Sequence, residues 1–274
     1  MRPTGLKYLV LASALVLTSV PTMVQAEIDF GELAISEDIA PQERLTKKIE
    51  LTRDALSMAI EKAEAMKTSL ETLELETASP EEELKNLYLS EVAGYLTFYR
   101  EREAALDAVT SPEEVDAFIQ TVIKYREGVY APSAKNVLEF ILVFSYNPSV
   151  LKTAKERYVS IAADAARLSG LGLIEEVLCK AALEQCQTTL DEAAQLQSQA
   201  REALLAAHQS AVALEEATET PLEGSAESET TVEAMAAPVV LTPKELSEMS
   251  LNKIKEAYTV FIETGQKIKE ALGI

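Results

Sequence analysis

Apolar side chains recur with helical spacing along the chain, and the longest such stretch runs from residue 173 to residue 217. It contains neither proline nor glycine, and two positions of its seven-residue pattern hold apolar or small side chains. This pattern predicts a long helix that packs on another helix along a coiled-coil-like seam. One position of the seam carries Leu183, Leu190, Leu204 and Ala211, and the other carries Cys179, Cys186, Ala193, Ala200, Ala207 and Leu214.

Prolines mark the starts of the other predicted helices, because proline fits the first helical turn and disrupts later ones. Three prolines follow a capping residue and precede a glutamate that completes a capping box: Ser79 with Glu82, Ser111 with Glu114, and Thr242 with Glu245. Gly128 and the Ser-Gly-Leu-Gly run at 169–172 indicate helix ends. We expect helices at 41–77, 80–109, 112–129, 133–146, 148–168, 173–217 and 243–272, and no strands.

The first of these helices has an alanine-containing seam of its own, so we expect it to be the antiparallel partner of the 173–217 helix. Small seam residues allow close approach of the helix axes, and a bulky Ala200→Phe substitution is predicted to separate the pair. Residues 88–158 hold eleven of the fifteen aromatic residues and should form the globular core. The predicted fold is all-α, an elongated multi-helix bundle with long antiparallel coiled-coil-like helices and a tethered C-terminal amphipathic helix.

That C-terminal helix follows a change in composition. Residues 202–243 contain no lysine or arginine and are rich in Glu, Ser, Thr and Ala, which predicts a flexible acidic linker at 218–242. The helix at 243–274 could dock on its own chain or serve as an arm for a partner. Its apolar residues lie at 3-4 spacing: Leu251, Ile254, Tyr258, Phe261, Ile268 and Leu272.

The N-terminus predicts export. Residues 1–26 have a basic start, an apolar middle of about thirteen residues and small residues before Ala26, as in a signal peptide. The remaining regions are an extended segment at 27–40, a helical bundle domain at 41–217, the linker at 218–242 and the C-terminal helix at 243–274. We expect a periplasmic or secreted protein that is soluble after signal cleavage.

The formal net charge of -20 argues against nucleic acid and anionic membranes as partners, because both need a positive protein surface. The most apolar run, residues 137–144, is too short to span a bilayer and should be a buried helix. We therefore expect a protein partner or self-association through helices, and no particular small molecule is indicated.

Residues that could carry chemistry are few. His208 is the only histidine, there is no Cys-x-x-Cys pair, and no glycine-rich phosphate loop is present. We predict no catalytic residue, no cofactor site and no metal site, and thus a protein that is not an enzyme.

Cys179 and Cys186 are the one pair of residues whose side chains could react with each other. In a straight helix their Cα atoms would lie roughly 10.5 Å apart, whereas a disulfide needs less than about 7 Å. They could be buried free thiols, they could form intermolecular disulfides between two copies, or a local helix break could let them meet.

Heptad seams without catalytic groups favour one function above others. We expect an exported, non-enzymatic helical scaffold or interaction protein of the bacterial envelope that acts through helix-helix contacts. Two alternatives are a secreted helical membrane-active, toxin-like protein and a periplasmic helical chaperone-like binder of an apolar client. A deep groove lined by Tyr88, Tyr95, Phe98 and Phe144 would favour the chaperone-like binder.

Overall fold

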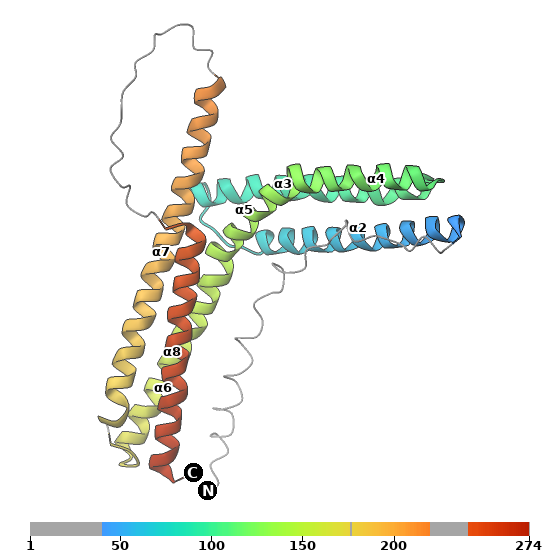
Figure 1. The fold of residues 1–274 in the computed structure, drawn as a ribbon. Helices are drawn as coiled ribbons and strands as arrows, with labels where there is room; N and C mark the ends of the chain where they lie inside the picture. Colours follow the sequence, from blue (N-terminus) through green and yellow to red (C-terminus); the bar gives the residue numbers. More distant parts are fainter. Residues whose placement is uncertain (1–39, 176, 220–240, 274) are drawn as a thin grey trace, which may run out of the picture. The chain divides into compact units, whose positions relative to one another are not determined.

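The computed structural model describes residues 40–175, 177–219 and 241–273, and every regular element among these residues is helical (Figure 1). The all-α prediction is confirmed. The chain divides into two compact units, the first unit (residues 1–138) and the second unit (residues 139–274). This division falls inside the 41–217 region, for which the sequence suggested one bundle domain. The expected signal peptide, the segment at 27–39 and nearly all of the expected linker lie outside the described residues.

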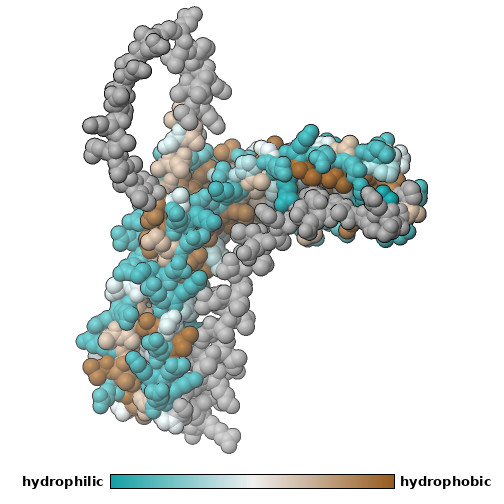
Figure 2. Space-filling view, in the orientation of Figure 1, coloured by the Kyte–Doolittle hydropathy of each residue, from teal (hydrophilic) through white to brown (hydrophobic). Residues whose placement is uncertain are grey.

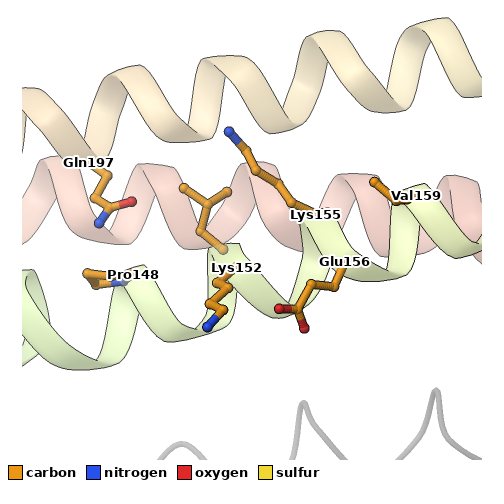
Figure 3. A pocket seen from close by; sticks show the side chains of 7 residues that line it. Pro148, Lys152, Lys155, Glu156, Val159 and Gln197 are labelled. Atoms are coloured by element: carbon orange, nitrogen blue, oxygen red, sulfur yellow. The ribbon is translucent and has the colours of Figure 1, made fainter.

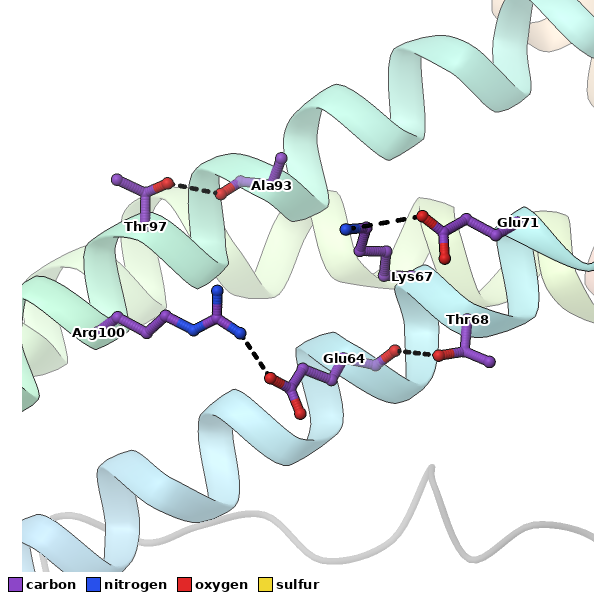
Figure 4. Close-up of polar contacts among 7 residues, drawn as sticks. All are labelled: Glu64, Lys67, Thr68, Glu71, Ala93, Thr97 and Arg100. Atoms are coloured by element: carbon purple, nitrogen blue, oxygen red, sulfur yellow. Dashed lines mark hydrogen bonds and ion pairs between the residues drawn. The ribbon is translucent and has the colours of Figure 1, made fainter.

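The first unit is built from α2 (Pro41–Glu71), α3 (Pro80–Ala105), the short 3-10 helix η3 (Leu106–Ala108) and α4 (Pro112–Tyr125). α2 packs along α3 and also contacts α4. Charged pairs flank these contacts: Arg100 of α3 lies 2.6 Å from Glu64 of α2 (Figure 4), and Lys48 of α2 lies 2.6 Å from Asp116 of α4. Elements that follow one another in the sequence therefore pack together.

Aromatic rings form a large part of the core of the first unit. The Tyr99 ring is 1% exposed and meets the rings of Phe98, Tyr125 and Tyr130 edge to face. Phe98 and Tyr125 stack with centroids 3.5 Å apart. Burial raises the pKa of Tyr99 and raises that of Tyr95 to about 12, so these hydroxyls stay neutral. The aromatic-rich part of the sequence does supply a core, but the second unit has another core of its own.

α2 ends at Glu71 rather than at residue 77 as predicted. The chain then turns, with Ala78 at a φ of 60°. Lys85 donates from Nζ to the Leu73 carbonyl at 2.6 Å, which satisfies a backbone group left open after the helix end. Ser79 caps α3 by accepting from the Glu82 amide, but the Glu82 carboxylate accepts from the Ala78 amide instead of the Ser79 amide. Only half of the first predicted capping box is therefore formed.

Helical residues continue without a loop from Pro112 to Gly170, where the sequence predicted three separate helices. α4 is followed by the π-helical segment η4 (Arg126–Tyr130), by α5 (Ala131–Ile141), by a second π-helical segment η5 (Leu142–Tyr146) and by α6 (Asn147–Gly170). α5 and α6 begin with Pro132 and Pro148 in their first turns, close to the predicted starts, but π-helical turns and not loops precede them, and Gly128 does not end the helical run.

The two π-helical segments explain why these prolines do not end the helix. A proline inside an α-helix clashes with the carbonyl four residues earlier and cannot donate a hydrogen bond to it. For Pro132 that carbonyl belongs to Gly128, and for Pro148 it belongs to Phe144. Both carbonyls lie in π-helical segments, where the backbone bonds with a wider spacing. The backbone hydrogen bonds around each proline therefore already have π-helical spacing, so the helix can continue through Pro132 and Pro148.

The second unit contains α6, α7 (Val177–Glu219) and α8 (Pro243–Leu272), and α7 packs against both other helices. α7 runs antiparallel to both (Figure 1). Ser250 of α8 contacts Ala193 and the later Ala257 contacts Cys186. Likewise, Lys155 of α6 pairs with Asp191 and the later Tyr158 bonds to Gln187. The predicted pairing of the long helix with the first helix is wrong: α7 packs with α8 and α6, and α2 packs with α3 and α4. Small residues on α7 bury more apolar area against the large side chains of α8 than against another alanine-containing seam.

The other two capping boxes are formed as predicted. Ser111 and Glu114 start α4, and Thr242 and Glu245 start α8, each with both reciprocal hydrogen bonds. Hydrogen bonds from the backbone amide and the hydroxyl of Thr242 lower the pKa of the Glu245 carboxyl, and bonds from Thr110 and Ser111 do so for Glu114. α8 ends before Gly273, whose φ of 69° suits a glycine cap.

Candidate functional site

The apolar face of α8 lies against α6 and α7 of the same chain. Ile254, Tyr258, Phe261 and Ile268 are buried, and Leu251 and Leu272 are half-buried. These side chains pack against smaller or aliphatic side chains of the other two helices. The residues contacted are Leu151, Ala154 and Ile161 of α6 and Cys186, Leu190 and Ala193 of α7. All six seam residues named from the sequence therefore lie in cores of the second unit.

A buried polar cluster joins the three helices near the start of α8. The Ser250 hydroxyl lies 2.8 Å from the Ala193 carbonyl, to which it donates, and 3.2 Å from Oδ1 of Asn147. Asn147 donates from Nδ2 to the Ser247 carbonyl at 3.4 Å. Asn147, Ser247 and Ser250 are completely buried, and the Ser247 hydroxyl has no hydrogen-bond partner. Because buried polar groups need matched partners, this cluster favours one register of α8 over others.

Charged side chains flank the α8 contact. Lys253 lies 3.0 Å from Glu192 of α7 and 3.2 Å from Glu256. Its hydrogen bond to Glu192 is the largest cause of its raised pKa. The Lys244 amide donates to Glu139 at 3.0 Å, in the first turn of α8. Because these contacts are exposed, they orient α8 on the neighbouring helices more than they add to the free energy of unfolding.

Cys179 and Cys186 lie on α7 and are buried free thiols, 3% and 1% exposed. α7 is continuous through both, so no helix break brings them together. The Cys186 thiol donates to the Ala257 carbonyl at 3.4 Å, and burial raises its pKa to about 11. Burial also raises the pKa of Cys179, although the nearby charge of Lys267 opposes this. Both thiols are held protonated, and while α8 is docked they offer no surface to a second chain.

An open groove runs between α6 and α7, with a volume of about 610 Å³ (Figure 3). Val159, which is 63% exposed, and the half-buried Pro148 contribute apolar surface to it. Lys155 reaches toward α7, whereas Lys152 and Glu156 point the other way (Figure 3). The lining residues on α6 recur at intervals of three and four, and α7 adds one side chain: Pro148, Leu151, Lys152, Lys155, Glu156 and Val159, with Gln197.

Sequence reasoning missed this groove. The only signal was the spacing of Pro148, Leu151 and Val159 along α6, and where α8 docks decides that Leu151 is buried and Val159 exposed. Apolar patches also interrupt the hydrophilic surface of the second unit in Figure 2. Its most exposed large apolar side chains, apart from Val159, are Leu171, Leu173 and Val177 at the turn between α6 and α7.

Within residues 40–175, 177–219 and 241–273, no three His, Cys, Asp or Glu side chains come together in a way that could hold a metal ion. None of the described helices is both long and apolar enough to cross a bilayer. Comparisons with protein-family models, with curated proteins and with solved structures give no match to this chain.

Proposed function

We propose that this chain is an exported, non-enzymatic helical interaction protein of the bacterial envelope, which acts through helix-helix contacts. The observation that carries the proposal is the seam between α7 and α8, where small residues of α7 receive Ile254, Tyr258 and Phe261. The groove between α6 and α7 is a further helix-sized surface with exposed apolar side chains. The buried, protonated thiols support a structural role for the two cysteines.

The aromatic side chains bear on the alternatives. Tyr88 and Tyr95 are buried and Phe98 stacks on Tyr125 in the first unit, whereas Phe144 is buried in the second unit, so these four rings do not line one deep groove. Residues Val137, Phe140, Val143 and Phe144 of the most apolar run are buried as well. These facts support an interaction protein over a client-binding chaperone or a membrane-active protein.

Site-specific photo-crosslinking in the bacterial envelope tests the proposal. A photoreactive side chain replaces one exposed apolar residue at a time: Leu51 or Leu87 in the first unit, Val159 or Val177 in the second. Lys124, which is exposed on α4, serves as the polar control. We expect discrete protein adducts from at least one apolar position and none from the control. Absence of a discrete adduct at every position contradicts the proposal.

Flotation of the mature chain with vesicles of zwitterionic and anionic lipid separates the membrane-active alternative. We expect no vesicle binding at physiological salt, because the surface charge is strongly negative. Binding to either vesicle would replace the proposed function with the membrane-active one.

Export itself is part of the proposal and has a direct test. Mass spectrometry of the chain recovered from the periplasm or medium should give the mass of residues 27–274, since cleavage is expected after Ala26. A chain that keeps residues 1–26 and remains in the cytoplasm would remove the envelope from the proposal.

A further inference from the structure

The groove between α6 and α7 has the geometry of a vacant helix position. Its six lining residues on α6 follow the i, i+3, i+4, i+7 pattern from Pro148 to Val159, which lie eleven positions apart. At 1.5 Å per residue this is about 16 Å, or three helical turns. A helix is therefore the natural occupant, because a compact ligand would leave most of this length open to water.

The charge of α6 differs from that of the other α-helices in the described part of the chain. Between Asn147 and Gly170 it carries four basic residues and two acidic ones, a net charge of +2. Every other described α-helix is neutral or negative, and α7 has two basic and seven acidic residues. A positive helix in a chain with a formal charge of -20 is thus a local exception.

In the groove, the positively charged side chains of α6 lie beside the apolar surface. Lys152 is exposed next to the apolar positions of α6. Lys155 lies 3.8 Å from Asp191, at the outer limit of an ion pair, and both side chains are substantially exposed. Glu156 is the only acidic side chain in the lining, and Asp191 of α7 offsets part of the charge of Lys155, so the excess positive charge lies chiefly at Lys152. Such a surface suits apolar side chains flanked by carboxylates.

We propose that the α6–α7 groove binds an acidic amphipathic helix of a partner protein, with apolar residues of that helix against Pro148 and Val159 and its carboxylates beside Lys152 and Lys155. This inference rests on the proposed helix-helix function and names the surface and the class of partner. Bound in this way, the partner helix would be the fourth helix of the second unit.

Two labelled peptides test the proposal with the mature full chain. Both are three-heptad helical peptides with leucine on one face; one carries glutamate on both flanks of that face, and the other carries lysine at the same positions. Fluorescence anisotropy at about 0.15 M salt, where the Debye length is about 8 Å, measures binding. The negative chain would attract the basic peptide non-specifically, so tighter binding of the acidic one reports on the groove. We expect the acidic peptide to bind at least about tenfold more tightly.

Matched variants locate the binding site. Lys152→Glu with Lys155→Glu should weaken acidic-peptide binding by at least about tenfold. Lys124→Glu with Lys135→Glu, which makes the same charge change at exposed positions elsewhere, should leave it within about twofold. Val159→Ser should weaken binding, whereas Val177→Ser should not, and both positions are exposed enough for the fold to tolerate the change. Circular dichroism of each variant confirms that it is folded.

Three results would overturn the proposal. One is equal binding of the two peptides or no binding of the acidic one. Another is concentration-dependent dimerisation in light scattering that Val159→Ser abolishes, because the occupant would then be a second copy. The last is tight binding of a fluorescent fatty acid that Val159→Ser abolishes, which would assign the groove to a small amphiphile. Crosslinks from Leu51, Leu87 or Val177 alone would leave the interaction function standing while this site fails.

Discussion

The two units reach a packed core by different means. In the first unit, large rings meet around Tyr99, and consecutive helices pack on one another. In the second unit, small residues of α7 receive large residues of α8, a helix that follows a segment outside the described residues. A core made of a few large rings concentrates its stability at few positions, whereas a seam distributes it along a helix.

The two units also differ in how much buried surface the undocking of a single helix would expose. Removal of α8 would uncover Cys186 and Ala193 and the buried polar cluster around Asn147. Among residues 40–138 of the first unit, no helix comes from a comparable distance in the sequence. The second unit is therefore the one in which docking of a helix is itself an equilibrium that substitutions can shift.

Truncation of a ring should have the largest effect. Tyr99→Ala removes the centre of the aromatic cluster and should cost about 3–5 kcal/mol of unfolding free energy. Hydrogen exchange by mass spectrometry should show lost protection in α3 and α4. Tyr99→Phe keeps the ring and should cost about 1 kcal/mol or less. Equal losses for the two variants would mean that the ring packing is not what holds the first unit.

Overpacking of the α7–α8 seam should come next. Ala193 is completely buried under α8, and Ala193→Phe should cost about 1–3 kcal/mol because the helices must move apart. Protection should fall in α8 and remain in α3. The control Ala206→Phe lies at an exposed position of α7 and should leave both unchanged. Loss of protection in α3 with intact α8 would reverse the assignment of this seam.

Two serines of α8 should respond in opposite directions. Ser250→Ala removes the donor to the Ala193 carbonyl and should destabilise by about 1 kcal/mol. Ser247→Ala removes a buried hydroxyl without a partner and should be neutral or stabilise by up to about 1 kcal/mol. Urea unfolding followed by circular dichroism measures both. A loss for Ser247→Ala as large as for Ser250→Ala would show that the Ser247 hydroxyl is satisfied.

The smallest effect should come from the two capping glutamates, one in each unit. Hydrogen bonds lower the folded-state pKa of Glu114 and Glu245, so their contribution to stability is present above the unfolded pKa and lost as pH falls through the folded pKa. Glu114→Gln and Glu245→Gln should each lower Tm slightly at neutral pH. The difference from the unmodified chain should vanish well below the ordinary glutamate pKa of about 4.3. A difference that persists in acid would not come from the carboxylate charge.

Local signals in the sequence determined the class of fold and many helix starts. Ser111, Thr242 and the prolines that follow them act within one helical turn, so α4 and α8 begin where predicted. The same holds for the helical character of α7, whose heptad pattern needs no knowledge of the partner. The burial of the α8 seam could also be anticipated, although the sequence left open whether it would dock on its own chain.

Only the tertiary structure decided which surfaces meet. A heptad seam shows that a helix packs but not on which helix, and the partner of α7 proved to be α8 instead of α2. The helix continues through Pro132 and Pro148 because π-helical hydrogen bonding precedes each proline, and no pattern of side chains in the sequence predicts this bonding. The groove beside Val159 exists because α8 covers one side of α6 and α7 and leaves the other open. Packing chooses among faces of similar apolarity, and that choice depends on the shapes of all three helices together.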